Sequence, residues 1–591
     1  VWLTEDFVIL WTGLAEGSQP VLATWALRLC VFGVGFVCGS FLAPLFNMLL
    51  AGFFKLFNLF FDVTTGAYGV VVGLLLKIGI VMVGVYIALM GLTYFGFNTV
   101  PVGFIPEQDK GYLLVNATLP EGASHERTAE VIAELEVIAA KTPGVAHTIS
   151  VSGYSLLSSV SLSNAGGMFV ILDPFASRAV HSEQSSFAIA RKLRNDFFRV
   201  RDARCVVFNA PPIDGLGNTG GFKLQIRDRT GHGSTELEQT TAGLADALAA
   251  QPGLVGLFSS FKANQPQLFI NIDRTKAKAA GVSIESIHQT LQVYLGSTYV
   301  NDFTAFGRNW QVMAQADAPF RMLPEDIGRL EVRNNDGEMV PLATLLTVEE
   351  TSGPAVVTRY NLAPSADLSG STLAGTSSGD AIALVETLAS QPPAGQGLLP
   401  QGIDFEWTDL SLQQILAGNT ASFVFAMGTL FVFLVLAAQY ESWLLPLAVI
   451  LIVPMCLLAA ISGVWIAGSD NNIFTQIGLL VLVGLAAKNA ILIVEFAKQR
   501  EADGLPRTQA VLEAATQRLR PILMTSLAFI LGVVPLLIGR GAGAEMRVAL
   551  GTAVFSGMLG VTVFGIFFTP VFYSVIMWLS PKNDTKTSVL P

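Results

Sequence analysis

Long apolar stretches recur along this chain, and one large segment of mixed polarity separates them. A helix needs about 20 apolar residues to cross a bilayer. Seven stretches meet that length: 21–45, 78–98, 417–438, 444–468, 475–497, 521–539 and 548–578. The segment between the second and third stretches has an ordinary soluble composition. The pattern predicts a membrane α-helical bundle of about six to seven helices, five of them in 411–580, with a large soluble region inserted.

Basic residues indicate which side of the membrane each connection faces, because positive charge collects on the cytoplasmic side. Segment 498–520 carries five basic residues, which are Lys498, Arg500, Arg507, Arg518 and Arg520. The tail 581–591 adds Lys582 and Lys586, whereas Arg540 and Arg547 fall on the opposite side. Segment 498–520 and the tail are therefore expected in the cytoplasm, and residues 100–415 are expected outside it.

An aromatic stretch precedes the second span. Residues 53–61 read FFKLFNLFF, with Lys55 among the aromatic side chains. This composition suits a helix that lies in the membrane interface, so segment 46–77 is predicted to be a cytoplasmic interfacial helix. The alternative is that 53–61 is only the end of the preceding span.

The soluble region contains a repeated order of elements. GYLLVNATLP (111–120) is typical of a strand, 124–141 has helical periodicity, and VAHTISVSG (145–153) is again typical of a strand. The same order recurs at the segments 221–228, 234–251 and 253–261, and 267–295 once more runs from strand into helix. Two strand–helix–strand units predict α+β subdomains of the split βαβ type.

Composition and charge narrow the class of protein. Hydrophobic residues make up 52% of the 591 residues and charged residues 14%, and the mean hydropathy is +0.55. A soluble protein of this size is less apolar. The net charge of −10 argues against a nucleic-acid partner, which needs a basic surface. The chain begins with Val1 and an acidic stretch rather than a signal peptide, so a chain that lacks its own beginning is expected.

Motifs for other chemistries are missing from the sequence. It contains no G-x-x-x-x-G-K-[ST], which argues against an ATP-driven transporter, and no H-E-x-x-H. Its four cysteines are scattered, so neither a disulfide framework nor a metal site is predicted. No nucleophile elbow or histidine cluster indicates a membrane enzyme. No cofactor is expected.

A lysine in the fifth apolar stretch is the first candidate for function. Lys488 lies about eleven residues past Ile477, near the middle of a stretch long enough to span. A charged side chain there costs several kcal/mol and by default marks a functional site. The alternative is a lysine that snorkels to the interface, which requires a position near a helix end.

Six longer motifs resemble one family in order and spacing. They are GFIPEQDKGY (103–112), GSTYVNDF (296–303), FRMLPEDIG (320–328), LAAQYESW (436–443), GLAAKNAILIVEFAK (484–498) and RLRPILMTSLAFILGVVPL (518–536). The chain resembles the C-terminal half of an inner-membrane multidrug efflux transporter of the resistance–nodulation–division (RND) family, of the hydrophobe/amphiphile, acriflavine-resistance type. The resemblance covers roughly 50–580, and residues 1–45 do not match it.

The resemblance implies an architecture for the whole chain. Segment 1–45 would be a hydrophobic remnant of a preceding span, and 78–98 a transmembrane helix. The periplasmic region would hold ferredoxin-like porter subdomains and a docking subdomain. The expected bounds are 99–218 for the first porter subdomain, 219–264 with 352–410 for the second, and 265–351 for docking.

The resemblance also implies a function and partners. Such pumps are homotrimers in the inner membrane of Gram-negative bacteria. They are driven by proton influx and joined to a periplasmic adaptor and an outer-membrane channel. They export hydrophobic and amphiphilic molecules. The thirteen methionines are dispersed, which favours organic substrates over metal ions. The family's N-terminal half would be a missing partner.

The resemblance assigns a proton relay to three residues. In the family, the lysine that matches Lys488 lies beside a pair of aspartates in the other half, and Thr525 and Arg518 match two further members. The alternatives are a Thr525 hydroxyl that bonds its own helix and an Arg518 that only follows the positive-inside rule. Glu495 is either a carboxylate at the cytoplasmic end or an interfacial charge. No other span has an acidic residue in its core, so this chain alone is not expected to couple protons to transport.

Two further sets of residues follow from the resemblance. Drug-pocket positions would be Leu114, Ile149, Val151, Tyr154, Leu156, Phe169, Val206 and Phe208, with 153–164 as a switch loop; the alternative for each is plain subdomain core. Docking to the channel would use Tyr299, Asn301 and Asp302, unless YVNDF is an ordinary strand end. As a whole, the chain is expected to be part of a drug/proton antiporter; the alternative is an assembly module that complements a separate half, or a nonfunctional remnant.

Overall fold

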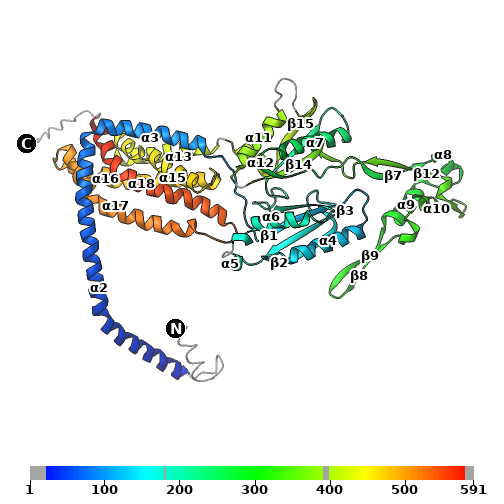
Figure 1. Ribbon diagram of the computed structural model, residues 1–591, viewed down its shortest axis with the longest axis horizontal. Coiled ribbons are helices and arrows are strands. Elements are labelled where there is room, and N and C mark those ends of the chain that lie inside the picture. Colours follow the sequence, from blue (N-terminus) through cyan, green and yellow to red (C-terminus); the bar gives the residue numbers. More distant parts are fainter. Residues whose placement is uncertain (1–20, 179–181, 374, 391–397, 419, 579–591) are drawn as a thin grey trace, which may run out of the picture.

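The protein consists of a helical bundle and an elongated α/β region that extends from one end of the bundle (Figure 1). The computed structural model describes residues 21–178, 182–373, 375–390, 398–418 and 420–578. Residues 1–20 of the predicted segment 1–45, and the predicted tail 581–591, lie outside the described residues.

Six helical segments pack along a common direction in the bundle. They are α3 (Gly79–Thr99), α13 (Thr420–Tyr440), α14–α15 (Leu444–Ile450 and Val453–Ile466), α16 (Ile473–Ala502), α17 (Arg507–Leu537) and α18 (Ala544–Trp578). The break between α14 and α15 precedes Pro454, which cannot donate a backbone hydrogen bond. Together with Leu50–Lys77, the described residues hold seven helices long and apolar enough to cross a membrane. The six in the bundle match predicted spans, whereas Leu50–Lys77 falls in the segment predicted to be an interfacial helix.

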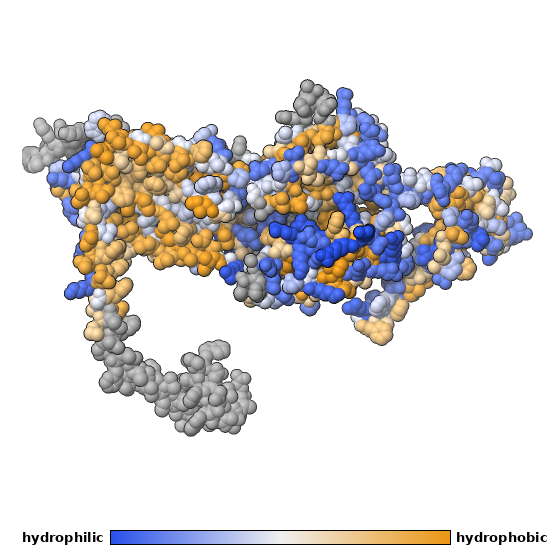
Figure 2. Space-filling view, in the orientation of Figure 1, coloured by the Kyte–Doolittle hydropathy of each residue, from blue (hydrophilic) through white to orange (hydrophobic). Residues whose placement is uncertain are grey.

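The bundle buries its core on one side and leaves another side open. Met455, Leu482, Val494 and Val561 are fully or almost fully buried where α15, α16 and α18 meet. In contrast, α3 and α13 expose most of their apolar side chains, as the orange surface in Figure 2 shows. A continuous apolar surface of this extent requires lipid or a protein partner.

Helix α2 (Val21–Lys77) is a single helix of 57 residues. It runs across the bundle at the end farthest from the α/β region (Figure 1). Its Tyr68 and Val72 pack against Ala515 and Leu519 of α17, and the Tyr68 hydroxyl donates to the Ile566 carbonyl at 2.6 Å. No helix break therefore separates 1–45 from 46–77 within the described residues, and the helix continues through position 44 although a proline stands there.

The first α/β unit is a four-stranded antiparallel sheet with helices on one face. Its strands lie in the order β2-β3-β1-β4, and its elements are β1 (Tyr112–Thr118), α4 (His125–Ala140), β2 (Val145–Ser155), β3 (Val160–Leu172), α5 (Phe175–Arg178), α6 (Ser186–Phe197) and β4 (Arg204–Asn209). Ser124 caps α4 by accepting from the Arg127 N–H. Leu113, Leu135 and Leu193 fill the core between sheet and helices.

The second α/β unit is formed by two separated segments of the chain. Its main sheet has the order β13-β14-β5-β15, and β6 also pairs with β14. The elements are β5 (Phe222–Asp228), α7 (Ser234–Ala249), β6 (Leu254–Phe258), β13 (Thr358–Tyr360), β14 (Ala363–Thr372), α11 (Ser378–Ser390) and β15 (Ile403–Thr408). Helix α12 (Asp409–Ala417) then leads into the bundle.

A third unit is inserted between β6 and β13 and lies farthest from the bundle (Figure 1). Strands β7 (Gln265–Ile272) and β12 (Leu346–Gly353) pair as its stem. Beyond them lie α8 (Arg274–Ala279), α9 (Ile284–Leu291), α10 (Pro324–Arg329), β10 (Glu331–Arg333) and β11 (Met339–Pro341) around a small core. A hairpin of β8 (Thr298–Ala305) and β9 (Arg308–Ala314) projects from this unit.

Candidate functional site

Lys488 lies in the middle of α16 and faces out of the bundle, and the exposed faces of α16 and α17 around Lys488 and Thr525 are called the open side. Its side chain is exposed, in line with Ile477 and Val481 on the same helix face. Among the described residues, no carboxylate lies within 4.0 Å of its ammonium group. Lys488 is thus an unpaired cation on an apolar surface, far from either end of a 30-residue helix.

Thr525 and Arg518 both lie on α17, the neighbour of α16. Thr525 is exposed on the open side, and its hydroxyl donates to the Ile522 carbonyl at 3.1 Å. Arg518 lies nearer the connection between α16 and α17, with its guanidinium 4.4 Å from the centre of the Phe496 ring. The Glu495 carboxylate accepts from Gln499 at 3.3 Å. The structure thus places Lys488 and Thr525 on the same open side, with Arg518 toward the connection between α16 and α17.

Four of the predicted drug-pocket residues form one row across the first sheet. Ile149 pairs with Phe169, Phe169 with Leu114, and Leu114 with Phe208. Because side chains alternate along a strand, this row lies on the face opposite α4 and α6. Val151 and Val206 belong to the next row on that face.

The same face contacts the second α/β unit. Leu114 and Phe208 form a buried cluster with Leu157 and with Phe258 of β6, and Leu156, Phe169 and Val206 pack against it. Ile149 and Val151 stay outside this cluster with 54% and 43% exposure. The structure thus gathers five of the eight predicted positions between two units and leaves two on an open edge.

The predicted switch loop 153–164 is mostly paired strand. Tyr154 pairs with Ser161 and Ser155 with Val160, so β2 and β3 continue into this segment and only 156–159 form the turn. Small polar side chains suggested a loop, but the backbone pairing extends through them. Tyr154 therefore lies on a strand end beside this turn.

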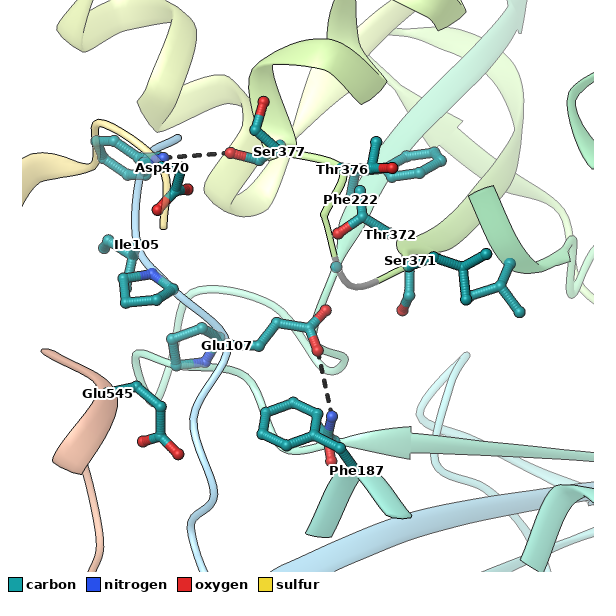
Figure 3. A pocket seen from close by; sticks show the side chains of 18 of the residues that line it. Ile105, Glu107, Phe187, Phe222, Ser371, Thr372, Thr376, Ser377, Asp470 and Glu545 are labelled. Carbon is teal, nitrogen blue, oxygen red and sulfur yellow. Dashed lines mark hydrogen bonds between the residues drawn. The ribbon is translucent and has the colours of Figure 1, made fainter. Parts of the chain in front are cut away.

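A cavity of about 820 Å³ lies where the bundle meets both α/β units. Figure 3 shows Glu107 pointing into it, with Glu545 of α18 and Asp470 on the bundle side. Phe208 and Phe222 supply apolar wall from the two units. The volume is in the range of cavities that hold drug-sized ligands.

Glu107 is an acidic side chain that lines this cavity. Its carboxylate accepts from the Asn209 side chain at 3.2 Å. Burial raises the pKa of Glu107 above its ordinary value, and the Asn209 hydrogen bond and the charge of Arg194 offset only part of that effect. Glu107 belongs to the GFIPEQDKGY motif, but sequence reasoning gave it no role; an acidic residue between a span and a strand was the available signal.

The predicted docking residues lie on the projecting hairpin. Tyr299, Asn301 and Asp302 are exposed on β8, and Phe303 faces Trp310 across the strands, both also exposed. An isolated two-stranded hairpin is marginally stable in water. An exposed aromatic pair on such a hairpin is typical of a contact surface.

Comparison with known proteins agrees with the resemblance. The sequence matches the AcrB/AcrD/AcrF family over residues 27–577. It is 40% identical over 533 residues to the multidrug export protein AcrF of Escherichia coli K12, which covers 89% of this chain and 50% of AcrF. It is 37% identical over 561 residues to the toluene efflux pump membrane transporter TtgB of Pseudomonas putida, which covers 94% of this chain and 52% of TtgB.

A third relative, the multidrug resistance protein MdtF of Escherichia coli K12, is 39% identical over 484 residues, covering 81% of this chain and 46% of MdtF. The chain spans about half the length of the curated relatives it matches. Extent of match, identity and the apolar helices all agree: this chain belongs to the AcrB/AcrD/AcrF family of RND multidrug efflux transporters.

Proposed function

We propose that this chain is the C-terminal half of a proton-driven pump that exports hydrophobic and amphiphilic compounds across a Gram-negative cell envelope. The observation that carries the proposal is Lys488, an unpaired cation on the open apolar side of the bundle. A second helical bundle that docks on this side would bury it. Only a partner that brings carboxylates makes such burial tolerable.

The proton step follows from this pairing. While the partner's carboxylates are ionised, they hold the Lys488 ammonium. When protons enter and neutralise them, the ammonium loses its counter-charge and moves, and α16 and α17 shift with it. A local change of charge thereby biases a packed element that has two arrangements. Thr525 exchanges hydrogen bonds within the relay, and Arg518 lies at its cytoplasmic mouth.

We propose the same partners that the resemblance implies. An N-terminal half supplies the carboxylates, and the two halves together form the protomer of a homotrimer. The α/β units are ferredoxin-like porter subdomains in the periplasm, and α2 lies along the inner membrane surface. The projecting β8–β9 hairpin, with Tyr299, Asn301 and Asp302, meets the outer-membrane channel, and a periplasmic adaptor completes the assembly.

Substrates bind between the first two α/β units. The row Ile149–Phe169–Leu114–Phe208 offers an apolar wall without fixed polar partners, which suits ligands of different shapes. The cavity at the bundle end of the same junction is large enough for one such ligand and contains the Glu107 carboxylate. We assign Leu156, Val151, Val206 and Tyr154 to the periphery of this route.

Co-expression tests the proposed function. A host deleted for its own drug pumps would receive this chain alone, an N-terminal half of an AcrB/AcrD/AcrF-family protein alone, or both, with adaptor and channel present. Only the pair should raise resistance to amphiphilic drugs, because only the pair holds both members of the charge pair. Proton-coupled export by this chain alone in liposomes would contradict the proposal, as would an inactive pair whose halves associate correctly.

Glu107 should favour cationic ligands in the cavity. Glu107→Gln in the purified chain is expected to weaken binding of a fluorescent organic cation such as rhodamine 6G about fivefold, the equivalent of about 1 kcal/mol. Because burial raises the pKa of Glu107 above the ordinary 4.5, binding by the unmodified chain should begin to weaken on acidification at a higher pH than for an ordinary carboxylate, and the Gln variant should lose this dependence. Fluorescence polarisation measures both effects.

Two controls accompany this binding measurement. Glu130→Gln removes an exposed carboxylate from α4, on the helix-covered face of the first sheet, and should leave binding unchanged. An uncharged dye of similar size should bind both Glu107 forms equally. Equal binding of the cation by both forms at pH 8 would exclude Glu107 from the ligand site.

A further inference from the structure

A buried polar contact joins α16 to α17 one residue away from the proposed relay. The Asn489 side-chain amide donates to the Ser526 hydroxyl at 3.0 Å, and the two side chains are 5% and 1% exposed. In contrast, Thr429, Ser462 and Thr562 donate their hydroxyl groups to backbone carbonyls of their own helices. The link between Tyr573 and Glu501 is also between side chains, but it involves a charged group near the helix ends.

This hydrogen bond can form at only one axial position of α17 relative to α16. One turn away from Ser526 on α17 lie Ile522 and Ile530, both buried and apolar. A shift of α17 by one turn, about 5.4 Å, would bring one of these opposite Asn489. The amide would then be buried without a partner, which is costly in an apolar interior. The contact therefore favours one axial position of α16 against α17.

That position determines where the proposed relay residues lie. Consecutive residues are rotated by about 100° around a helix, so Lys488 and Thr525 point to the open side while Asn489 and Ser526 point inward, as their burial shows. The short connection between α16 and α17 makes them antiparallel (Figure 1). With about 1.5 Å of rise per residue, Lys488 and Thr525 are offset by only about 3 Å along the axis.

We infer that Asn489 and Ser526 are positioning residues that hold Lys488 level with Thr525 across the α16–α17 contact. This inference rests on the proposed proton relay. The pair does not touch the proton path itself; it acts through the register of two helices. During a transport cycle the two helices would therefore move together, with Lys488 reorienting against a fixed Thr525 rather than sliding past it.

Crosslinking measures the register without any transport. Lys488→Cys is paired with Thr525→Cys or with Gly532→Cys, which lies two turns farther along the same face of α17 and has open space around it. A short bifunctional thiol reagent is applied to the chain in native membranes, and crosslinked peptides are quantified by mass spectrometry. The yield of crosslinked peptide should be about five times higher for the 488–525 pair than for the 488–532 pair. The reason is the axial offset, which is about 3 Å for the first pair and about 7.5 Å for the second.

Three changes are then compared in this background. Asn489→Leu with Ser526→Ala removes both polar partners, so that no buried polar group is left without a hydrogen bond. The ratio of the 488–525 yield to the 488–532 yield should then fall below about two. Asn489→Ser with Ser526→Asn exchanges the partners and should restore it. Thr562→Val, a buried hydroxyl that bonds only its own helix, should leave it intact. If the double apolar variant does not accumulate, Ser526→Ala alone serves for the same comparison.

The outcomes separate this inference from the proposed function. If the ratio of the 488–525 to the 488–532 crosslinking yield is unchanged in the apolar variants, the inference is wrong, whether or not the pump is active. If the preference falls and the exchange restores it, the positioning role holds at the level of structure. Drug resistance with the co-expressed N-terminal half should then follow the same pattern, lost in the apolar variant and recovered in the exchange, at equal protein amount. An inactive unmodified pair would count against the proposed function alone.

Discussion

Replacing Lys488 by alanine should abolish the drug resistance that this chain confers together with an N-terminal half. The expected fall in the inhibitory drug concentration is at least about tenfold, down to the level of the pump-deleted host, because the ammonium is the only group proposed to respond to the partner's carboxylates. The amount of protein in the membrane should not fall, because the partner's carboxylates can take up protons when they lose the charge of Lys488, and no buried charge is then left unpaired. Susceptibility testing and immunoblotting measure the two quantities.

Two further variants separate charge from packing. Lys488→Met keeps the length and apolar stem of the side chain without the charge, and should be as inactive as the alanine variant. Lys498→Ala removes an exposed lysine ten residues farther along α16, where its ammonium lies 5.7 Å from the Tyr440 ring centre. It should keep resistance within about twofold, since exposed charges contribute little. Transport by the methionine variant would contradict a charge-driven relay.

The membrane bundle was predictable because its signals are local. An apolar run of about 20 residues leaves a chain few alternatives, so the runs at 78–98 and 475–497 correspond to α3 and α16 with ends shifted by only a few residues. The strand at 111–120 and the helix at 124–141 likewise correspond to β1 and α4. In each case the hydrophobic pattern acts within one element, and α4 and α16 also have capping side chains, Ser124 and Asn472.

Relations between distant elements were not predictable in this way. The periodicity of α2 is weak because it is apolar on every side, so the sequence could not show that residues 21–77 form one helix across the end of the bundle. The register Ile149–Phe169–Leu114–Phe208 depends on strand pairing over long separations. The resemblance supplied those residue names, whereas the sheet explains why they lie together.

The cavity illustrates the same limit. Glu107, Asp470 and Glu545 are far apart in the sequence and come from a linker, an interhelical turn and the start of α18. Nothing local marks them as neighbours. Lys488 differs, because its position within an apolar run is itself the anomaly. A single residue that conflicts with its surroundings can be found from sequence, but a site assembled from ordinary residues requires the fold.

The second large effect concerns a buried ion pair in the first α/β unit, beside a contact of that unit with the bundle. Arg178 contacts both oxygens of Asp109, at 2.9 and 3.1 Å, and its side chain is 3% exposed. Asp109 also accepts from the backbone N–H of Ser186, which begins α6, and its own N–H donates to Glu545 of α18. Arg178→Met should destabilise this unit by about 3–5 kcal/mol, because it leaves a buried carboxylate without its counter-charge.

A matched control is available on the surface of the same unit. Arg127 and Asp202 form an ion pair at 2.9 Å with both side chains more than half exposed. Arg127→Met should cost less than about 1 kcal/mol, as exposed pairs do. The urea midpoint for proteolysis within 99–218 of the purified chain measures both variants. An Arg178→Met midpoint no lower than that of Arg127→Met would show that the buried pair does not hold the unit together.

Lowering the pH should reduce the difference in stability between Arg178→Met and the unmodified chain. Burial acts to raise the pKa of Asp109, but hydrogen bonds from Arg178, Ser186 and Gly111 outweigh it and lower the pKa below the ordinary 3.8. The stability that the pair contributes is therefore fully present above pH 3.8 and is lost as the pH falls through the depressed value. In Arg178→Met the burial effect is no longer offset by the arginine, so the carboxylate takes up its proton at a higher pH, and that proton removes the unpaired charge. The difference in urea midpoint between Arg178→Met and the unmodified chain should thus shrink between pH 7.5 and pH 4.5. The small difference for Arg127→Met should stay constant. If the difference for Arg178→Met widens on acidification, the loss of stability comes from packing around Arg178 and not from its charge.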